Sequence, residues 1–177
     1  VGMEYEQLIP WVKPVEVSED GNWKPSDKAF RVIPGDYVTT EDGTGIVHIA
    51  PTFGADDANV ARAAGIPSLF MINKKGETRP MVDLTGNFVK ECVDVDKYKE
   101  YQGAWVKNAY DPQFMVDGKY DEKAAQAAES LDLVIAMMMK ADNKAFKIEK
   151  HVHNYPHCWR TDKPVLYYPL DSWFIRS

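Results

Sequence analysis

Residues 43–57 read Gly43-Thr44-Gly45-Ile46-Val47-His48-Ile49-Ala50-Pro51-Thr52-Phe53-Gly54-Ala55-Asp56-Asp57. The stretch predicts a tight turn at Asp42-Gly43, because glycine supplies the positive φ that such a turn needs. A buried strand is expected over Gly45–Ile49, paired through that turn with Tyr37–Thr40. After a second turn at Phe53-Gly54, an alanine-rich helix is expected over Ala55–Ala64. A histidine on the strand and two carboxylates in the first helical turn form a corner that suits binding.

These polar residues also have purely structural explanations. Asp56 and Asp57 can cap the helix and complement its dipole. His48 can equally be a core histidine whose hydrogen bonds are satisfied. The residues alone leave both explanations open.

The composition describes an ordinary globular chain. Its 177 residues can bury one sizeable core, which predicts one domain with an appendage. The two cysteines, Cys92 and Cys158, suit a reducing compartment, and no apolar run is long enough to span a bilayer, so we expect a cytoplasmic location. The net charge of −6 argues against a nonspecific nucleic-acid coat. An RNA partner would therefore need a local basic patch.

Such a patch is expected between residues 140 and 163, where basic residues outnumber acidic ones and aromatic residues are interleaved. This composition is typical of a surface that meets a phosphate backbone. A solvated basic face is the alternative. The candidate phosphate-binding residues are Lys144, Lys147, Lys150 and Arg160.

The same region contains histidines at 151, 153 and 157, followed by Cys158. Imidazole nitrogens and a thiolate are ligands that zinc prefers. However, no second cysteine completes a recognised ligand pair near Cys158. The spacing alone leaves a metal site open.

Short strands and close turn signals predict an α+β fold with a β-barrel-like core of short strands and peripheral helices. Strands are expected over Phe30–Ile33 and Ser68–Ile72. The helices are expected at Ala55–Ala64 and at Asp121–Ala141, the second broken near Leu131-Asp132. A short helix is also expected over Asp96–Gln102.

The stretch 43–57 resembles, nearly residue for residue, the editing-domain signature of isoleucyl-tRNA synthetases, a class I aminoacyl-tRNA synthetase family. That signature is Gly-Thr-Gly, two apolar residues, His, any residue, Ala-Pro, a glycine-bearing loop and Asp. The related valyl and leucyl enzymes share the glycine turn and the later Asp but are not expected to carry His at position 48. The segments at 2–11, 154–160 and 163–175 also resemble this family, so the resemblance covers essentially the whole chain.

The resemblance implies an editing domain over residues 1–150 and a connection returning to the synthetic core over residues 151–177. It places a threonine-rich strand of the editing pocket upstream of Val1. The family's HIGH and KMSKS signatures do not occur here, so ATP and Mg are expected in the parent enzyme's synthetic domain and no cofactor is expected in this chain. Some members carry a zinc-binding Cys-Trp-Arg-Cys pair, but Thr161 stands where the second cysteine would be, so no zinc is predicted.

The resemblance also implies a function, the hydrolysis of mischarged valyl-tRNA(Ile) after transfer. Isoleucine differs from valine by one methylene, and this family is the usual illustration that a hydrophobic pocket discriminates such a pair by only about 1–3 kcal/mol. The predicted catalytic-site residues are Asp57, which would anchor the substrate's ammonium, and His48, which would limit the side-chain pocket. The turn Gly43-Thr44-Gly45 would let the backbone approach the substrate. Neither Asp57 nor His48 is assigned as a general base.

The expected partners are the 3′ end of tRNA(Ile) and the rest of the synthetase chain, in a monomer without membrane contact. Under this interpretation the four basic residues of the patch contact the tRNA. Two alternatives stay open. One is an editing domain of the valyl or leucyl type, and the other is a noncatalytic module that docks tRNA.

Overall fold

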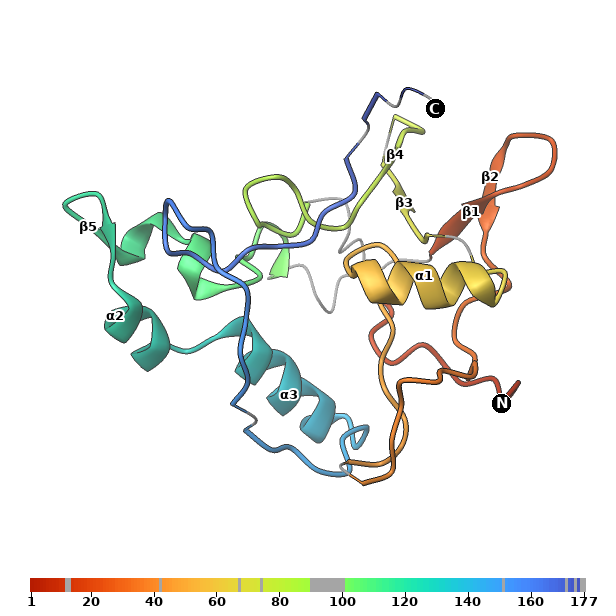
Figure 1. The fold of residues 1–177 in the computed structure, drawn as a ribbon, viewed down its shortest axis with the longest axis horizontal. Coiled ribbons are helices and arrows are strands. Elements are labelled where there is room, and N and C mark those ends of the chain that lie inside the picture. The colour runs from red at the N-terminus through yellow and green to blue at the C-terminus, as the bar shows by residue number, and fades with distance from the viewer. Residues whose placement is uncertain are drawn as a thin grey trace. The chain divides into compact units, whose positions relative to one another are not determined.

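The structure is a computed structural model that describes residues 1–11, 14–41, 43–66, 68–73, 75–89, 101–150, 152–170, 172, 173 and 175 (Figure 1). Its packing divides the chain into two compact units, which we describe separately. Unit 1 comprises Val1–Met81 and Tyr167–Ser177, and unit 2 comprises Val82–Leu166. The predicted boundary at residue 150 concerns an editing domain and its connection, which these units do not test, and it stays a prediction.

Unit 1 contains the helix α1 (Ala55–Ala63) and two hairpins, formed by β1 (Val15–Val17) with β2 (Trp23–Pro25) and by β3 (Met71–Ile72) with β4 (Thr78–Arg79). Unit 2 contains the 3₁₀ helices η3 (Asn108–Tyr110) and η4 (Pro112–Phe114), the hairpin of β5 (Met115–Val116) with β6 (Lys119–Tyr120), and the helices α2 (Glu122–Ala127) and α3 (Leu131–Ala141).

All three strand pairs are antiparallel and two-stranded. The fold is therefore a small mixed α and β structure, consistent with the predicted α+β class. In the described parts of the chain the strands do not close into a barrel, so the barrel-like core is not confirmed. No helix in those parts is long and apolar enough to cross a membrane.

The β1–β2 hairpin is held by Phe70, the residue just before β3, and by a buried carboxylate. The backbone N–H of Val15 donates to the carbonyl oxygen of Phe70 at 2.9 Å. Glu16 is only 2% exposed, and its carboxylate accepts a hydrogen bond from Ser26 Oγ at 2.9 Å. The ammonium groups of Lys24 and Lys28 lie 3.8 and 3.6 Å from the same carboxylate. This pairing satisfies a charge whose burial would otherwise be costly.

Helix α1 confirms the predicted alanine-rich helix to within one residue. Its buried face carries Ala61, which is 1% exposed. The helix ends where Gly65 adopts a φ of +71° and the N–H of Ile66 returns to the carbonyl of Ala61 at 2.8 Å. Glycine suits this position because a left-handed residue commonly terminates a helix.

The predicted hairpin between Tyr37–Thr40 and Gly45–Ile49 is wrong in the described residues. Neither arm is a strand, and the predicted burial of the second arm is also wrong, since Ile46 is 73% and Val47 52% exposed. A strand forms only where a partner satisfies its backbone groups, and no such ladder forms in this part of the described chain. The strand predicted over Phe30–Ile33 is likewise reduced to one bridge, between Glu4 and Arg31.

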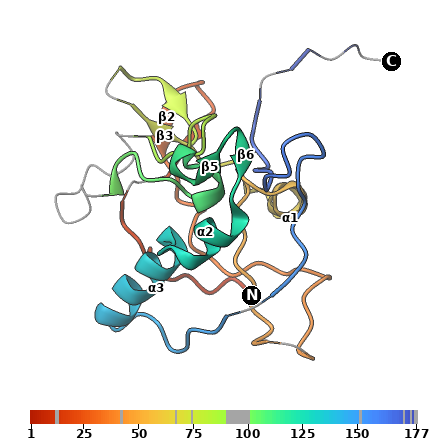
Figure 2. The same cartoon turned by 90° about the vertical axis from the view of Figure 1, so that its left-hand side faces the viewer.

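The helical region predicted over Asp121–Ala141 is confirmed in unit 2. It is broken between Ala127 and Leu131, just before the predicted break at Leu131-Asp132. Figure 2 shows α2 followed by α3 after a bend. The side chains of Asp121 and Ser130 accept backbone N–H bonds at the starts of α2 and α3, respectively. The break follows because Ser130 is a strong N-cap residue that begins a new helix. The helix predicted over Asp96–Gln102 lies mostly outside the described residues.

Gly86 gives a test of packing in unit 2. Its φ is +91°, and a Cβ at this position would lie 2.5 Å from the Tyr110 ring. We expect Gly86→Ala to destabilise the protein by more than about 2 kcal/mol, since strain and overlap add. The matched control is Gly103→Ala, where φ is +73° but a Cβ would meet nothing within 4 Å, so only about 1 kcal/mol is expected. Urea unfolding of both variants measures the difference, and equal losses would contradict this packing.

Candidate functional site

The Gly43-Thr44-Gly45 turn is held by left-handed backbone at both glycines. Their φ values are +79° and +72°. Between them, Thr44 Oγ1 accepts the N–H of Ile46 at 3.3 Å. A Cβ at Gly45 would lie 3.0 Å from Thr40 Cγ2, so this glycine also allows a close approach of chain to chain. The turn therefore depends on glycine for both conformation and space.

Asp57 does not cap α1 but binds the segment that precedes it. Its Oδ2 accepts the backbone N–H of Ala50 at 2.9 Å, and the start of α1 has no side-chain cap because its N-cap residue is Gly54. Asp57 is half-buried in the first turn of α1, where the helix dipole favours a negative charge. Its Oδ1 has no hydrogen bond to the described residues.

Gly54 makes this arrangement possible. A Cβ at this position would lie 2.7 Å from Asp57 Oδ2 and 2.9 Å from its Cγ. The φ of Gly54 is −145°, an extended value open to any residue, so the requirement is for space and not for backbone freedom. This role of Gly54 was not predicted from the sequence. The signal was the spacing Gly-Ala-Asp-Asp, which sets the glycine one helical turn before the second carboxylate.

His48 and Asp56 are both exposed, with no hydrogen bond to other described residues. The explanation of His48 as a buried core histidine is therefore wrong. His48 lies two residues before Ala50, the residue bound by Asp57, so the histidine and the carboxylate belong to one connected segment. Asp56 differs from its neighbour, since its side chain makes no hydrogen bond to the described residues of the 43–50 segment.

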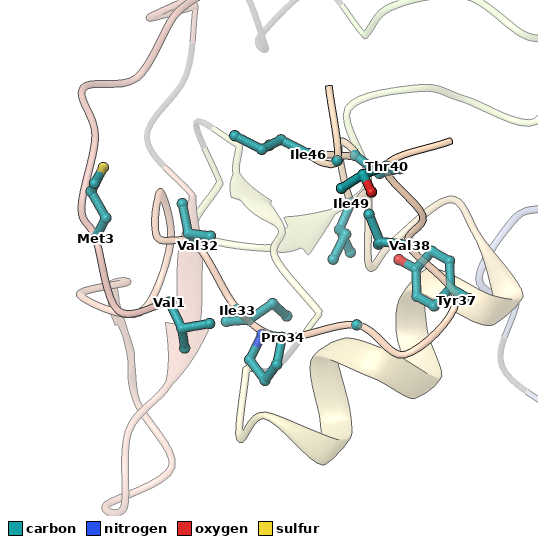
Figure 3. A pocket seen from close by; sticks show the side chains of 13 residues that line it. Val1, Met3, Val32, Ile33, Pro34, Tyr37, Val38, Thr40, Ile46 and Ile49 are labelled. Atoms are coloured by element: carbon teal, nitrogen blue, oxygen red, sulfur yellow. The ribbon is translucent and has the colours of Figure 1, made fainter. Parts of the chain in front are cut away.

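An apolar groove of about 480 Å³ lies beside the glycine turn in unit 1 (Figure 3). Val1 and Met3 line one side, and residues between Val32 and Ile49 line the other. Of the predicted site residues only Gly45 contributes to its lining; His48 and Asp57 do not. The structure thus joins Asp57 to the segment of His48 but does not place either residue in this groove.

The four candidate phosphate-binding residues lie in unit 2, and all are exposed. Lys147 is already paired with Glu149, at 2.6 Å between Nζ and Oε1. The guanidinium of Arg160 lies 4.5 Å from the centroid of the Trp159 ring. Lys147 and Arg160 thus each have a local partner in unit 2.

His157 and Cys158, two of the candidate metal ligands, make local hydrogen bonds. His157 Nδ1 lies 2.7 Å from the carbonyl of Tyr155, and a hydrogen bond with Thr161 lowers the pKa of the Cys158 thiol. Among the described residues, no three His, Cys, Asp or Glu side chains are grouped so that they could hold a metal ion. His151 lies outside those residues.

Comparison with known proteins decides the family. The chain is 87% identical, over its whole length, to an isoleucine–tRNA ligase of Bacteroides thetaiotaomicron. The chain belongs to the isoleucine–tRNA ligase family. It is also 66% identical to the isoleucine–tRNA ligase of Bacteroides fragilis and, over 99% of the chain, 36% identical to that of Clostridium acetobutylicum. No protein-family model matches the chain.

The chain spans only part of these isoleucine–tRNA ligases, 16% of the Bacteroides thetaiotaomicron protein and 12% of the Clostridium acetobutylicum protein. It therefore corresponds to a fragment of an isoleucine–tRNA ligase. The family identification argues against the alternative of a valyl-type or leucyl-type chain.

Gly54→Ala tests the geometry around Asp57. We expect the added methyl group to displace the Asp57 carboxylate and break its bond to Ala50, because the two groups would overlap. Amide hydrogen exchange at Ala50 should then accelerate in the isoleucine–tRNA ligase. Gly65→Ala is the control, since its Cβ would meet nothing within 4 Å and Ala50 should stay protected. Unchanged exchange at Ala50 in Gly54→Ala would contradict the arrangement.

Proposed function

We propose that this chain is the editing part of an isoleucine–tRNA ligase and hydrolyses valyl-tRNA(Ile). The observation that carries the proposal is the Asp57 carboxylate, held through one oxygen by the Ala50 N–H, while its other oxygen has no hydrogen bond to the described residues. A fixed carboxylate of this kind suits the ammonium of an aminoacyl ester, since charge-assisted hydrogen bonds are stronger than neutral ones. ATP and Mg would act elsewhere in the parent enzyme, which attaches isoleucine to its tRNA, in the cytoplasm.

The reaction is the hydrolysis of an ester. Water attacks the carbonyl carbon of the valyl ester, the bond to the ribose oxygen breaks, and that oxygen takes up a proton. Valine and free tRNA leave. Asp57 would orient the ester through its ammonium, and the glycine turn would bring backbone close to the ribose. No described residue is assigned as the base, and the upstream threonine-rich strand would assist in positioning the water.

A noncatalytic module that docks tRNA is the second candidate, favoured by the exposed lysines of unit 2. Deacylation of valyl-tRNA(Ile) separates the two functions. The assay compares this chain with a longer piece of the synthetase that includes the upstream strand. Hydrolysis by the longer piece supports editing, whereas binding of tRNA without hydrolysis by either piece supports docking.

Asp57→Asn separates ammonium binding from a structural role. Asparagine keeps an oxygen that can accept the Ala50 N–H, so the free energy of unfolding should change by no more than about 1 kcal/mol. Deacylation of valyl-tRNA by the full-length enzyme should fall about ten- to hundredfold, because the charged contact is lost. The matched control is Asp56→Asn, which should edit normally. Normal editing by Asp57→Asn would reduce Asp57 to a structural residue.

His48→Ala tests whether His48 limits the size of the pocket for the substrate's side chain. If His48 borders the side chain of the substrate, its removal enlarges the site, and the full-length enzyme should hydrolyse correctly charged isoleucyl-tRNA. The exposure of His48 means that the substitution should leave the fold intact. The measurement is the lifetime of isoleucyl-tRNA(Ile) with each enzyme. An unchanged lifetime would assign His48 another role.

A further inference from the structure

Residues 50–53 form a turn that carries the backbone N–H held by Asp57. The N–H of Phe53 donates to the carbonyl oxygen of Ala50 at 3.0 Å, which closes the turn. Pro51 stands at its second position, where the fixed φ of proline suits a turn. The N–H of Ala50, at the start of the turn, donates to Asp57 Oδ2. The placement of this carboxylate therefore depends on how the 50–53 turn is attached to the rest of unit 1.

Thr52 attaches the 50–53 turn to the segment just before β3. Its side chain is buried, and its Oγ1 donates to the carbonyl oxygen of Leu69 at 2.6 Å. Leu69 precedes Phe70, whose N–H and carbonyl oxygen are both bonded to Val15 of β1, at 3.3 and 2.9 Å. The acceptor of the Thr52 hydroxyl thus belongs to backbone that the β1–β2 hairpin fixes. Because an unpaired buried polar group is costly, this hydrogen bond restrains the turn firmly.

The apolar contacts of the same turn restrain it less. Pro51 and Leu69 line a small pocket of about 60 Å³, so the packing beneath the turn is incomplete. The Phe53 ring lies beside Tyr168, with 6.1 Å between the ring centroids and a tilted geometry. Apolar contacts are not directional, so neither one sets the direction of a backbone N–H. The hydrogen bond of Thr52 is directional and can do so.

We propose that Thr52 is a positioning residue of the editing site. Its hydroxyl fixes the 50–53 turn, the turn directs the Ala50 N–H, and that N–H holds the Asp57 carboxylate where it meets the substrate's ammonium. Because Thr52 is buried, it acts through Asp57 and does not touch the substrate. The inference rests on the proposed function, in which Asp57 binds the ammonium of the valyl ester. Nothing in the sequence indicates this role, because the donor and its acceptor are 17 residues apart.

The test measures deacylation of valyl-tRNA(Ile) by the full-length isoleucine–tRNA ligase that contains this chain. Thr52→Val keeps the shape of the side chain but removes the donor, so the rate should fall about tenfold through misplacement of the carboxylate. Thr52→Ser keeps the hydroxyl and should stay within roughly threefold of the wild-type rate. Amide hydrogen exchange at Ala50 should accelerate in Thr52→Val and not in Thr52→Ser.

Thr85→Val is the matched control. The Thr85 hydroxyl also donates a hydrogen bond of 2.6 Å, to Asp83, but it lies in unit 2. Its removal should leave both deacylation and the exchange at Ala50 unchanged. Thr52→Ala is a second test variant, because it removes the donor without placing a methyl group against the Leu69 carbonyl. It should lose deacylation as Thr52→Val does.

Combination with Asp57→Asn separates positioning from a simple loss of folded enzyme. A residue that acts through the carboxylate has little left to disturb once the charge is gone. Thr52→Val and Thr52→Ala should therefore cost less than about twofold in the Asp57→Asn background. An equal loss in both backgrounds would show that Thr52 supports only the fold, and it would overturn the inference.

Normal deacylation by both Thr52→Val and Thr52→Ala also overturns the inference, as does a loss in Thr52→Ser as large as that in Thr52→Val. Failure of the proposed function gives a different result. If Asp57→Asn edits normally, Asp57 does not bind the ammonium and both proposals fall. If Asp57→Asn loses hydrolysis while Thr52→Val and Thr52→Ala keep it, the proposed function stands and only the inference falls.

Discussion

The hydrogen bond from the Ala50 N–H to Asp57 Oδ2 is the interaction on which the candidate site depends. It ties the segment of His48 and the glycine turn to the first turn of α1, and the second carboxylate oxygen has no hydrogen bond to the described residues. A bond of this charged type contributes about 1.5–3 kcal/mol. The hydrogen bond also depends on Gly54, because a Cβ at this position would lie 2.7 Å from Asp57 Oδ2.

Much of this arrangement could be predicted because its causes are local. The alanine-rich segment predicted α1, and the Asp42-Gly43 pair predicted the positive φ at Gly43; the positive φ at Gly45, predicted as the start of a strand, was not expected. The partner of Asp57 could not be predicted, since a bond across seven residues depends on how the loop at 50–54 closes. The prediction of a strand over Gly45–Ile49 is wrong for a related reason. An apolar run predicts a strand only if another strand satisfies its backbone.

Exposed apolar side chains lie in the same predicted strand: Ile46 is 73% and Val47 52% exposed. Because the chain covers 16% of the Bacteroides thetaiotaomicron relative, the remainder of such a synthetase is available to cover them. The exposed apolar side chains are expected of a fragment of a longer polypeptide, whereas the predicted barrel stays unconfirmed.

The central claim is that Asp57 recognises the substrate's ammonium. It is tested most directly with tRNA(Ile) esterified by the hydroxy acid that replaces valine's ammonium with a hydroxyl group. Deacylation rates of this ester and of valyl-tRNA are measured with the full-length enzyme and with Asp57→Asn. If the claim holds, the wild-type enzyme hydrolyses the hydroxy ester far more slowly than valyl-tRNA, and Asp57→Asn treats the two esters alike. If both enzymes lose the same factor on the hydroxy ester, Asp57 does not bind the ammonium.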